Sequence, residues 1–172
     1  REGVNFSNGD PLTAEDVAFT MDLHKDPATQ SNAMTEALQI SETKVVDPKT
    51  VEFTLTEPWA GFPVLLAGVA GEVIPRDAYE ASTPEEWARN PIGAGAFVLD
   101  SYIPNQEVVL TPNPDYYGGP VCPTLEFQRI PGSKGTYDAF QTGEIQVGFL
   151  RGAKTVTEAQ DAGVQGFETI TS

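Results

Sequence analysis

The chain has 172 residues, of which 40% are hydrophobic, and it carries a net charge of −15 at neutral pH. Its length suits one domain or two small subdomains. The negative charge disfavours a nucleic-acid partner and an anionic membrane surface, because both need basic patches on the protein, whereas it is compatible with a cationic ligand.

Two rare residue types limit the kinds of site that the chain can build. The sequence has one cysteine, Cys122, so no disulfide can close within it. The turn-like sequence around Cys122 predicts a reactive thiol, which in an oxidising exterior would suggest a partner outside this chain. The lone histidine, His24, argues against a His-rich metal site and a Ser-His-Asp triad, and we expect it to be exposed at a helix end. No metal and no cofactor are therefore expected.

The first predicted element is also the clearest. Thr13 is a favoured N-cap, and Glu15 and Asp16 place acidic side chains in the first helical turn, where the helix dipole stabilises them. The helix is predicted to run from Ala14 to near Lys25. The other elements predicted before residue 92 are a short helix within 29–38, a hairpin with strands at 44–46 and 51–55, a short helix over 63–67, and a helix that starts at Pro84 behind the cap Thr83.

A glycine-rich phrase, NPIGAGAFVLD at residues 90–100, raises the question of a phosphate-binding loop. Such a loop needs backbone amides converging at a helix N-terminus and usually a lysine. Here the following residues, 96–103, are strand-like, and the next lysine downstream is Lys134. We therefore predict a tight turn before a strand, at which only glycine fits the backbone angles.

The rest of the chain alternates strand and helix patterns. The predicted elements are a second hairpin of 96–103 and 107–111, a strand over 125–130, a helix over 137–142 that stops at Gly143, a buried strand over 145–150, a helix over 155–162 that stops at Gly163, and a final strand over 164–170. This strand–helix order at the end is typical of βαβ units. The predicted fold class is α/β, as a mixed α+β arrangement.

No pattern typical of catalysis is found in the sequence. It has no zinc-ligand spacing and no Gly-x-Ser-x-Gly motif, and its carboxylates are scattered over many elements. An enzyme would need paired catalytic groups, and none is apparent. From the residues alone, we expect an acidic α/β domain without catalytic activity.

Three phrases in succession go further: REGVNFSNGDPLTAEDVAFTM, PIGAGAFVLDSYIPNQEVVLTPNPDYYGG and CPTLEFQRIPGSKGTYDAFQTGEIQVGFL. Their order and spacing resemble the family-5 extracellular solute-binding proteins, the receptors of peptide, dipeptide and nickel ABC importers. The chain departs from the family pattern Gly-Thr-Gly-Pro at Ala94 and Ala96, and Gln146 stands where an aspartate is usual. The resemblance covers nearly the whole chain.

The resemblance implies a fold and a cellular location for the protein. The fold would be a partial lobe of the type II periplasmic-binding-protein kind, with residues 1–91 as a small extra α+β subdomain of the first lobe and 92–172 as part of the ligand-binding lobe itself. The chain would be a fragment that lacks a signal peptide, the early strands and the second lobe. The whole protein would be a monomeric lipoprotein, extracellular or periplasmic, that delivers solute to the membrane permease of an ABC importer.

Two groups of residues are candidates for ligand contact. Phe149, Leu150 and Arg151 end the predicted buried strand, where the arginine could meet a peptide carboxylate; the alternative is an arginine on the surface after a core strand. Trp59 and Phe62 form the second group, with core packing as the alternative.

The function implied is non-catalytic capture of oligopeptides or dipeptides. Three alternatives stay open at this point: a receptor of the same family for nickel or another small solute, an enzyme of unknown type, and a structural or partner-binding surface domain.

Overall fold

The computed structural model describes residues 1–119, 121 and 123–166, and it divides into two compact units, Arg1–Phe127 and Gln128–Ser172. The first unit holds α1 (Ala14–Lys25), η1 (Pro27–Thr29), α2 (Met34–Ala37), β1 (Ile40–Asp47), β2 (Thr50–Leu55), α3 (Phe62–Leu65), η2 (Val69–Gly71), α4 (Arg76–Glu80), α5 (Pro84–Arg89), β3 (Phe97–Ile103) and β4 (Glu107–Pro112). The strand β5 (Leu125–Gln128) lies at the division, and the second unit holds α6 (Gly132–Thr142) and α7 (Ala153–Asp161). Mixed helices and strands confirm the predicted fold class.

The α1 helix has the predicted bounds because its first turn is capped as the sequence indicates. The Asp16 carboxylate accepts hydrogen bonds from the backbone N–H and the hydroxyl of Thr13, at 2.9 and 2.8 Å. This arrangement fixes the chain at the helix start. The amide of Ala14 donates to Pro48 in the turn of the β1–β2 hairpin, at 2.9 Å, so the helix start is also tied to that hairpin.

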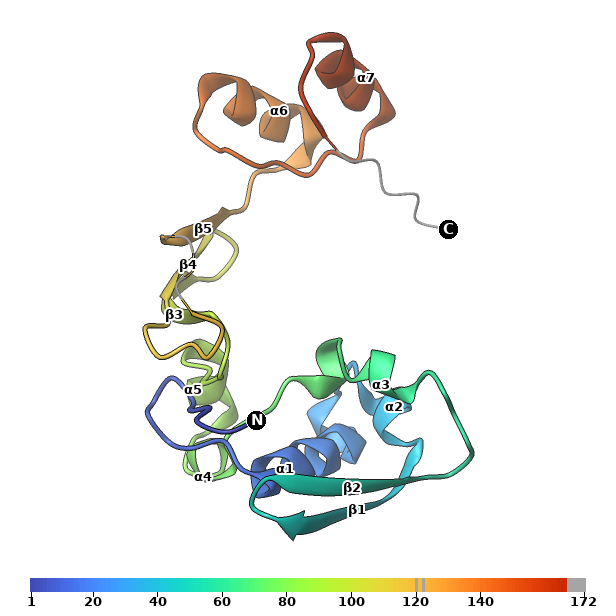
Figure 1. Cartoon of the computed structure of the whole chain (residues 1–172). Coiled ribbons are helices and arrows are strands. Elements are labelled where there is room, and N and C mark those ends of the chain that lie inside the picture. The colour runs from blue at the N-terminus through green and yellow to red at the C-terminus, as the bar shows by residue number, and fades with distance from the viewer. Residues whose placement is uncertain (120, 122, 167–172) are drawn as a thin grey trace. The chain divides into compact units, whose positions relative to one another are not determined.

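The main hydrophobic core of the first unit lies between α1, the β1–β2 hairpin and α3. Met21, Ile40 and Phe62 are buried there, and the inward-facing side chains of β2 pack on them. The rings of Phe53 and Phe62 meet edge to face, with centroids 5.8 Å apart. The helix α1 runs along the hairpin (Figure 1). The predicted alternation of β2 is confirmed, because Val51, Phe53 and Leu55 are half-buried while the residues between them are exposed.

The second predicted hairpin is confirmed as β3 and β4, which pair antiparallel and form a three-stranded sheet of order β3-β4-β5. Asn113, which is buried, holds the entry to β3. Its side-chain amide donates to the carbonyl of Gly95 and its backbone N–H to the carbonyl of Ala96, both at 2.9 Å. The hairpin is thereby attached to the glycine-rich phrase that precedes it.

Several predictions prove wrong. His24 is 8% exposed rather than exposed at the surface, because α1 packs against the segment that follows it. Gly93 and Gly95 do not have positive φ angles, so the prediction that only glycine fits there is incorrect. The α4 helix was not predicted at all, and α6 begins at Gly132, five residues before the predicted start.

The segment 145–150 is not a buried strand. Val147 and Phe149 are 87% and 66% exposed. In the described part of the chain no strand lies beside this segment, and a strand requires a neighbour to satisfy its backbone groups. The predicted final strand over 164–170 lies outside the described residues from position 167 on, as does Cys122. The predicted boundary at 91 concerns subdomains of a larger lobe and stays a prediction.

Candidate functional site

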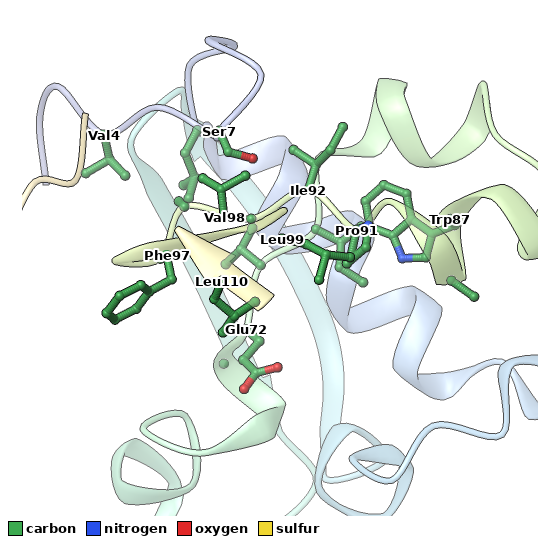
Figure 2. Close-up of a pocket in the computed structure, with 18 of the residues that line it drawn as sticks. Val4, Ser7, Glu72, Trp87, Pro91, Ile92, Phe97, Val98, Leu99 and Leu110 are labelled. Atoms are coloured by element: carbon green, nitrogen blue, oxygen red, sulfur yellow. The ribbon is translucent and has the colours of Figure 1, made fainter. Parts of the chain in front are cut away.

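The first unit contains an apolar groove with a volume of about 900 Å³. Its walls come from the N-terminal loop, from residues 71–74, from α5, from the glycine-rich phrase and from the faces of β3 and β4. Figure 2 shows Trp87, Pro91 and Ile92 on one side, Phe97 and Leu110 on another, and Glu72 below them. Among the described residues, Glu72 is the only charged one that lines the groove.

The wall formed by residues 71–74 is held in place by two side chains of α1. The hydroxyl of Thr20, which is fully buried, donates to the carbonyl of Asp16 at 2.8 Å and accepts from the N–H of Ile74 at 2.9 Å. The Asp16 carboxylate accepts a third hydrogen bond from the N–H of Arg76, at 3.0 Å, so it caps α1 and holds the start of α4. Gly71 packs so tightly that an added Cβ would lie 1.8 Å from the carbonyl oxygen of Leu66.

A row of aromatic rings places Trp87 at the groove. Phe19 of α1 contacts Tyr79 of α4 with ring centroids 5.8 Å apart, and Tyr79 contacts Trp87 of α5 at 5.0 Å. The α5 helix is capped as predicted, because the Thr83 hydroxyl accepts from the N–H of Glu86 at 3.2 Å while the Glu86 carboxylate accepts from the Thr83 N–H at 2.9 Å. The tryptophan is therefore held by both ring contacts and a fixed helix start.

Within the glycine-rich phrase, residues 93–95 form a part of the groove wall whose only side-chain atom is the methyl carbon of Ala94. The carbonyl of Gly93 accepts from the N–H of Ser7 at 2.9 Å, which joins the phrase to the N-terminal loop. A Cβ added at Gly93 or Gly95 would meet no atom within 4 Å. Neither the backbone angles nor crowding within the described chain requires glycine at these two positions.

The only histidine lies near the groove's single charge. His24 Nδ1 lies 2.6 Å from the hydroxyl of Ser31, and its Nε2 is buried with no hydrogen-bond partner among the described residues. Burial lowers the pKa of His24 below its ordinary value of 6.5, while the negative charge of Glu72 opposes this shift. The imidazole is therefore held neutral at neutral pH and forms part of the packing under α1.

Trp59 and Phe62, one of the predicted contact groups, lie together but outside the groove. Phe62 is 9% exposed and belongs to the hydrophobic core, whereas Trp59 is 42% exposed and its ring centroid is 6.4 Å from that of Phe62. The predicted role of the pair in ligand contact stays a prediction.

The other predicted group, Phe149, Leu150 and Arg151, lies in the second unit. The Arg151 guanidinium is 5.4 Å from the centre of the Phe149 ring, a cation–π distance. Leu150 is half-buried. The backbone N–H groups of Arg151 and Gly152 both donate to the Ser133 hydroxyl at 2.9 Å, so this loop is anchored to the first turn of α6. The group has a defined geometry, and its role in binding stays a prediction.

Sequence reasoning missed Glu72 and Trp87 as groove residues. Trp87 could have been found from its position three residues before the glycine-rich phrase, because segments so close in sequence often share one surface. No comparable sequence signal marks Glu72, because it reaches the groove only through the contacts of α1 with the segment that follows η2. The described residues include no group of three or more His, Cys, Asp and Glu side chains that could hold a metal ion, and no helix among them is long and apolar enough to cross a bilayer.

Comparison with known proteins identifies this fold. The chain is 30% identical over 172 residues to a Brucella ovis protein whose name describes it as an ABC transporter peptide-binding protein. The match covers 96% of this chain and 32% of that protein. It is 28% identical over 151 residues to the glutathione-binding protein GsiB of Escherichia coli O1:K1, which covers 87% of this chain and 29% of that protein. The chain thus spans about a third of the length of the curated relatives that it matches.

Among solved structures, the binding protein MoaA from A. tumefaciens R10, determined in complex with mannopinic acid, superposes with a TM-score of 0.83 at 28% identity, over 95% of this chain and 34% of that one. Residues 1–171 match the family described as bacterial extracellular solute-binding proteins, family 5, Middle. The phrases that suggested this family from the sequence are thus confirmed by the match and by the fold: the chain belongs to the family-5 bacterial extracellular solute-binding proteins.

Proposed function

We propose that this chain is part of the solute-capturing subunit of an ABC importer, and that the solute is a short peptide. The observation that carries the proposal is the groove of the first unit, which is mostly apolar, has Glu72 as the one charged residue among its described lining residues, and is bordered by glycines. Apolar clefts of about 300–1,000 Å³ with a few polar groups are typical of small-ligand sites. A peptide supplies both apolar side chains and a positive charge.

The family and the named relatives support this reading. Members of the family are transport receptors, and the Brucella and E. coli relatives are named for binding peptide and glutathione. The proposed partner is the membrane permease of the importer. The proposed location is outside the cytoplasmic membrane, where a lipid anchor on the complete protein would hold it, and the complete protein would act as a monomer without catalysing a reaction.

Native mass spectrometry of the receptor that carries these residues tests the proposal. When the receptor is purified without denaturation, it should retain bound ligands whose masses and fragmentation identify them as peptides. These peptides should be released from the receptor uncleaved. Retention of nickel or of a non-peptide solute would replace the peptide assignment. Cleavage products that increase in proportion to the purified receptor would contradict the non-catalytic role.

Arg151 provides a second test, of the predicted carboxylate contact. Arg151→Ala in the receptor should weaken binding of peptides with a free C-terminus by about tenfold or more, because a charge-assisted hydrogen bond is lost. Peptides amidated at the C-terminus should lose little. Lys154→Ala, which removes a charge that is 91% exposed on α7, is the matched control. Equal affinities of the Arg151 variant and the control would place Arg151 outside the ligand site.

A further inference from the structure

The end of α1 carries a buried titratable group that the proposed function does not use. His24 is 8% exposed, and its Nε2 atom is buried without a hydrogen-bond partner among the described residues. Its Nδ1 atom lies 2.6 Å from the hydroxyl of Ser31. That hydroxyl accepts a hydrogen bond from the N–H of Ala33 at 3.1 Å, which leaves its own proton free to be donated to Nδ1. The neutral ring therefore carries its proton on Nε2.

Protonation of the ring removes the contact that this arrangement provides. In the charged imidazolium both nitrogens are donors, so Nδ1 can no longer accept the proton of the Ser31 hydroxyl. The Nε2–H group stays buried without an acceptor among the described residues. A buried charge that lacks partners is costly, because water would solvate it better. The closed structure thus favours the neutral ring, and the charged ring is stabilised once it reaches water.

Residues 26–32 follow the ring in sequence, contact it through Ser31 and are only lightly attached to the rest of the unit. Thr29 and Ser31 are half-buried, and the other five residues of the segment are exposed. Side chains tie the segment to α1 at two points. Ser31 contacts His24, and the hydroxyl of Thr29 donates to the carbonyl of Leu23 at 3.0 Å. A segment with so few buried contacts opens at low cost in free energy.

The backbone of this segment is also strained in its closed form. Gln30 has φ 49° and ψ 37°, in the left-handed region that a residue with a Cβ atom disfavours. Directly after the segment, Ala33 is 2% exposed and fixes the chain to the interior. The segment can therefore open between Asp26 and Ala33 while the residues beyond it stay in place, and opening relieves the strain at Gln30.

The charges around the end of α1 do not compensate a proton on the ring. Burial, the larger effect, lowers the pKa of His24 below its ordinary value of 6.5, and the negative charge of Glu72 opposes this shift. Glu72 is exposed, so water screens it. The charged side chains on the last turns of α1 and on the segments packed around them are Asp22 and Lys25, which pair with each other at 3.6 Å, and Asp26, Glu36, Glu42 and Glu72.

We propose that residues 26–32 form an acid-operated flap: neutral His24 holds the flap closed through Ser31, and uptake of one proton by the imidazole releases it from the end of α1. The core around Met21 and Ile40 stays packed while the flap opens. The inference goes beyond the proposed function, because it does not depend on which solute is captured. A receptor outside the cytoplasmic membrane meets changes of pH directly, and the flap makes this part of its surface respond to them.

Hydrogen exchange followed by mass spectrometry tests the flap in the receptor that carries these residues. The protection of amides, corrected for the pH dependence of free exchange, is measured from about pH 7.5 to 5 on both sides of the ordinary histidine pKa. Protection over 26–33 should fall below about pH 6.5 by up to about tenfold per pH unit, the largest change that one coupled proton can cause. Protection over 44–52, in the β1–β2 hairpin, should not change with it.

Two variants separate the proton from the hydrogen bond. His24→Gln cannot take up the proton, so protection over 26–33 should no longer depend on pH in this range, whatever its level. Ser31→Ala removes the contact with the ring and should lower protection over 26–33 about two- to tenfold at pH 7.5, the range of one hydrogen bond. Ser41→Ala is the matched control, because its hydroxyl donates to the Thr54 carbonyl on the exposed hairpin and should leave 26–33 unchanged.

Three outcomes would overturn the proposal. The same pH dependence in His24→Gln and in the unchanged receptor would show that another group takes up the proton. A parallel loss of protection over 44–52 would show that the whole unit opens and not the flap. Equal protection in Ser31→Ala and Ser41→Ala would show that the contact with the ring does not hold the segment, and this comparison at pH 7.5 decides the matter even if His24→Gln fails to fold.

Discussion

Replacing Asp16 by alanine should destabilise the first unit far more than replacing any other acid of α1. The Asp16 carboxylate accepts three hydrogen bonds, two from Thr13 at the start of α1 and one from the N–H of Arg76 at 3.0 Å. Loss of an N-terminal cap costs about 1 kcal/mol, and loss of a hydrogen bond to a charged group costs about 1.5 kcal/mol or more. The free energy of unfolding should therefore fall by about 2–3 kcal/mol, partly offset by the high helix propensity of alanine.

Urea unfolding monitored by tryptophan fluorescence measures this effect. Both tryptophans lie in the first unit, so the signal reports on that unit alone. Asp22→Ala is the matched control, because the Asp22 side chain is 71% exposed and forms an exposed ion pair with Lys25, at 3.6 Å. Exposed ion pairs contribute about 0–1 kcal/mol. Equal midpoints for the two variants would show that the bridge from α1 to α4 does not stabilise the unit.

Three more predictions follow from the same unit. Thr20→Val keeps the shape of the side chain but leaves the N–H of Ile74 without its partner at 2.9 Å, so unfolding in urea should become easier by about 1–3 kcal/mol, whereas Thr54→Val on the exposed face of β2 should cost little. Gly71→Ala places a Cβ 1.8 Å from the Leu66 carbonyl oxygen and should cost about 2 kcal/mol or more in a thermal melt, while Gly166→Ala, in open space, should be neutral. Burial lowers the folded-state pKa of His24 below 6.5, so the unfolded chain binds the proton more readily. Stability should therefore be full above about pH 6.5 and fall as the pH drops below it toward the folded-state pKa of His24. His24→Gln should flatten the fall in stability below about pH 6.5, and an unchanged slope would contradict the burial argument.

The sequence by itself determined the features that depend on short-range interactions. The bounds of α1, the start of α5 and the two hairpins could be predicted because caps, prolines and alternation act over a few residues, and each of these signals was present in full. The family could also be predicted, because the order of its phrases is a property of the sequence alone.

The tertiary structure decided which of these local pieces form a surface together. The existence of α4 and the position of Glu72 depend on Asp16 and Thr20 reaching residues more than 50 positions away. The burial of His24 depends on the segment after α1 packing back against the helix, and no local pattern records such contacts. The apolar run at 145–150 shows the converse, since its composition favours a strand but strand formation needs a neighbouring strand, and none lies beside it in the described part of the chain. Gly93 and Gly95 were recognised from the sequence as a backbone feature, yet only their ordinary φ angles excluded the tight-turn explanation, and only the folded chain shows that both residues line the groove. The physical reason is the same in each case: capping and turn formation are short-range interactions, whereas burial, strand pairing and groove formation depend on segments that only the folded chain brings together.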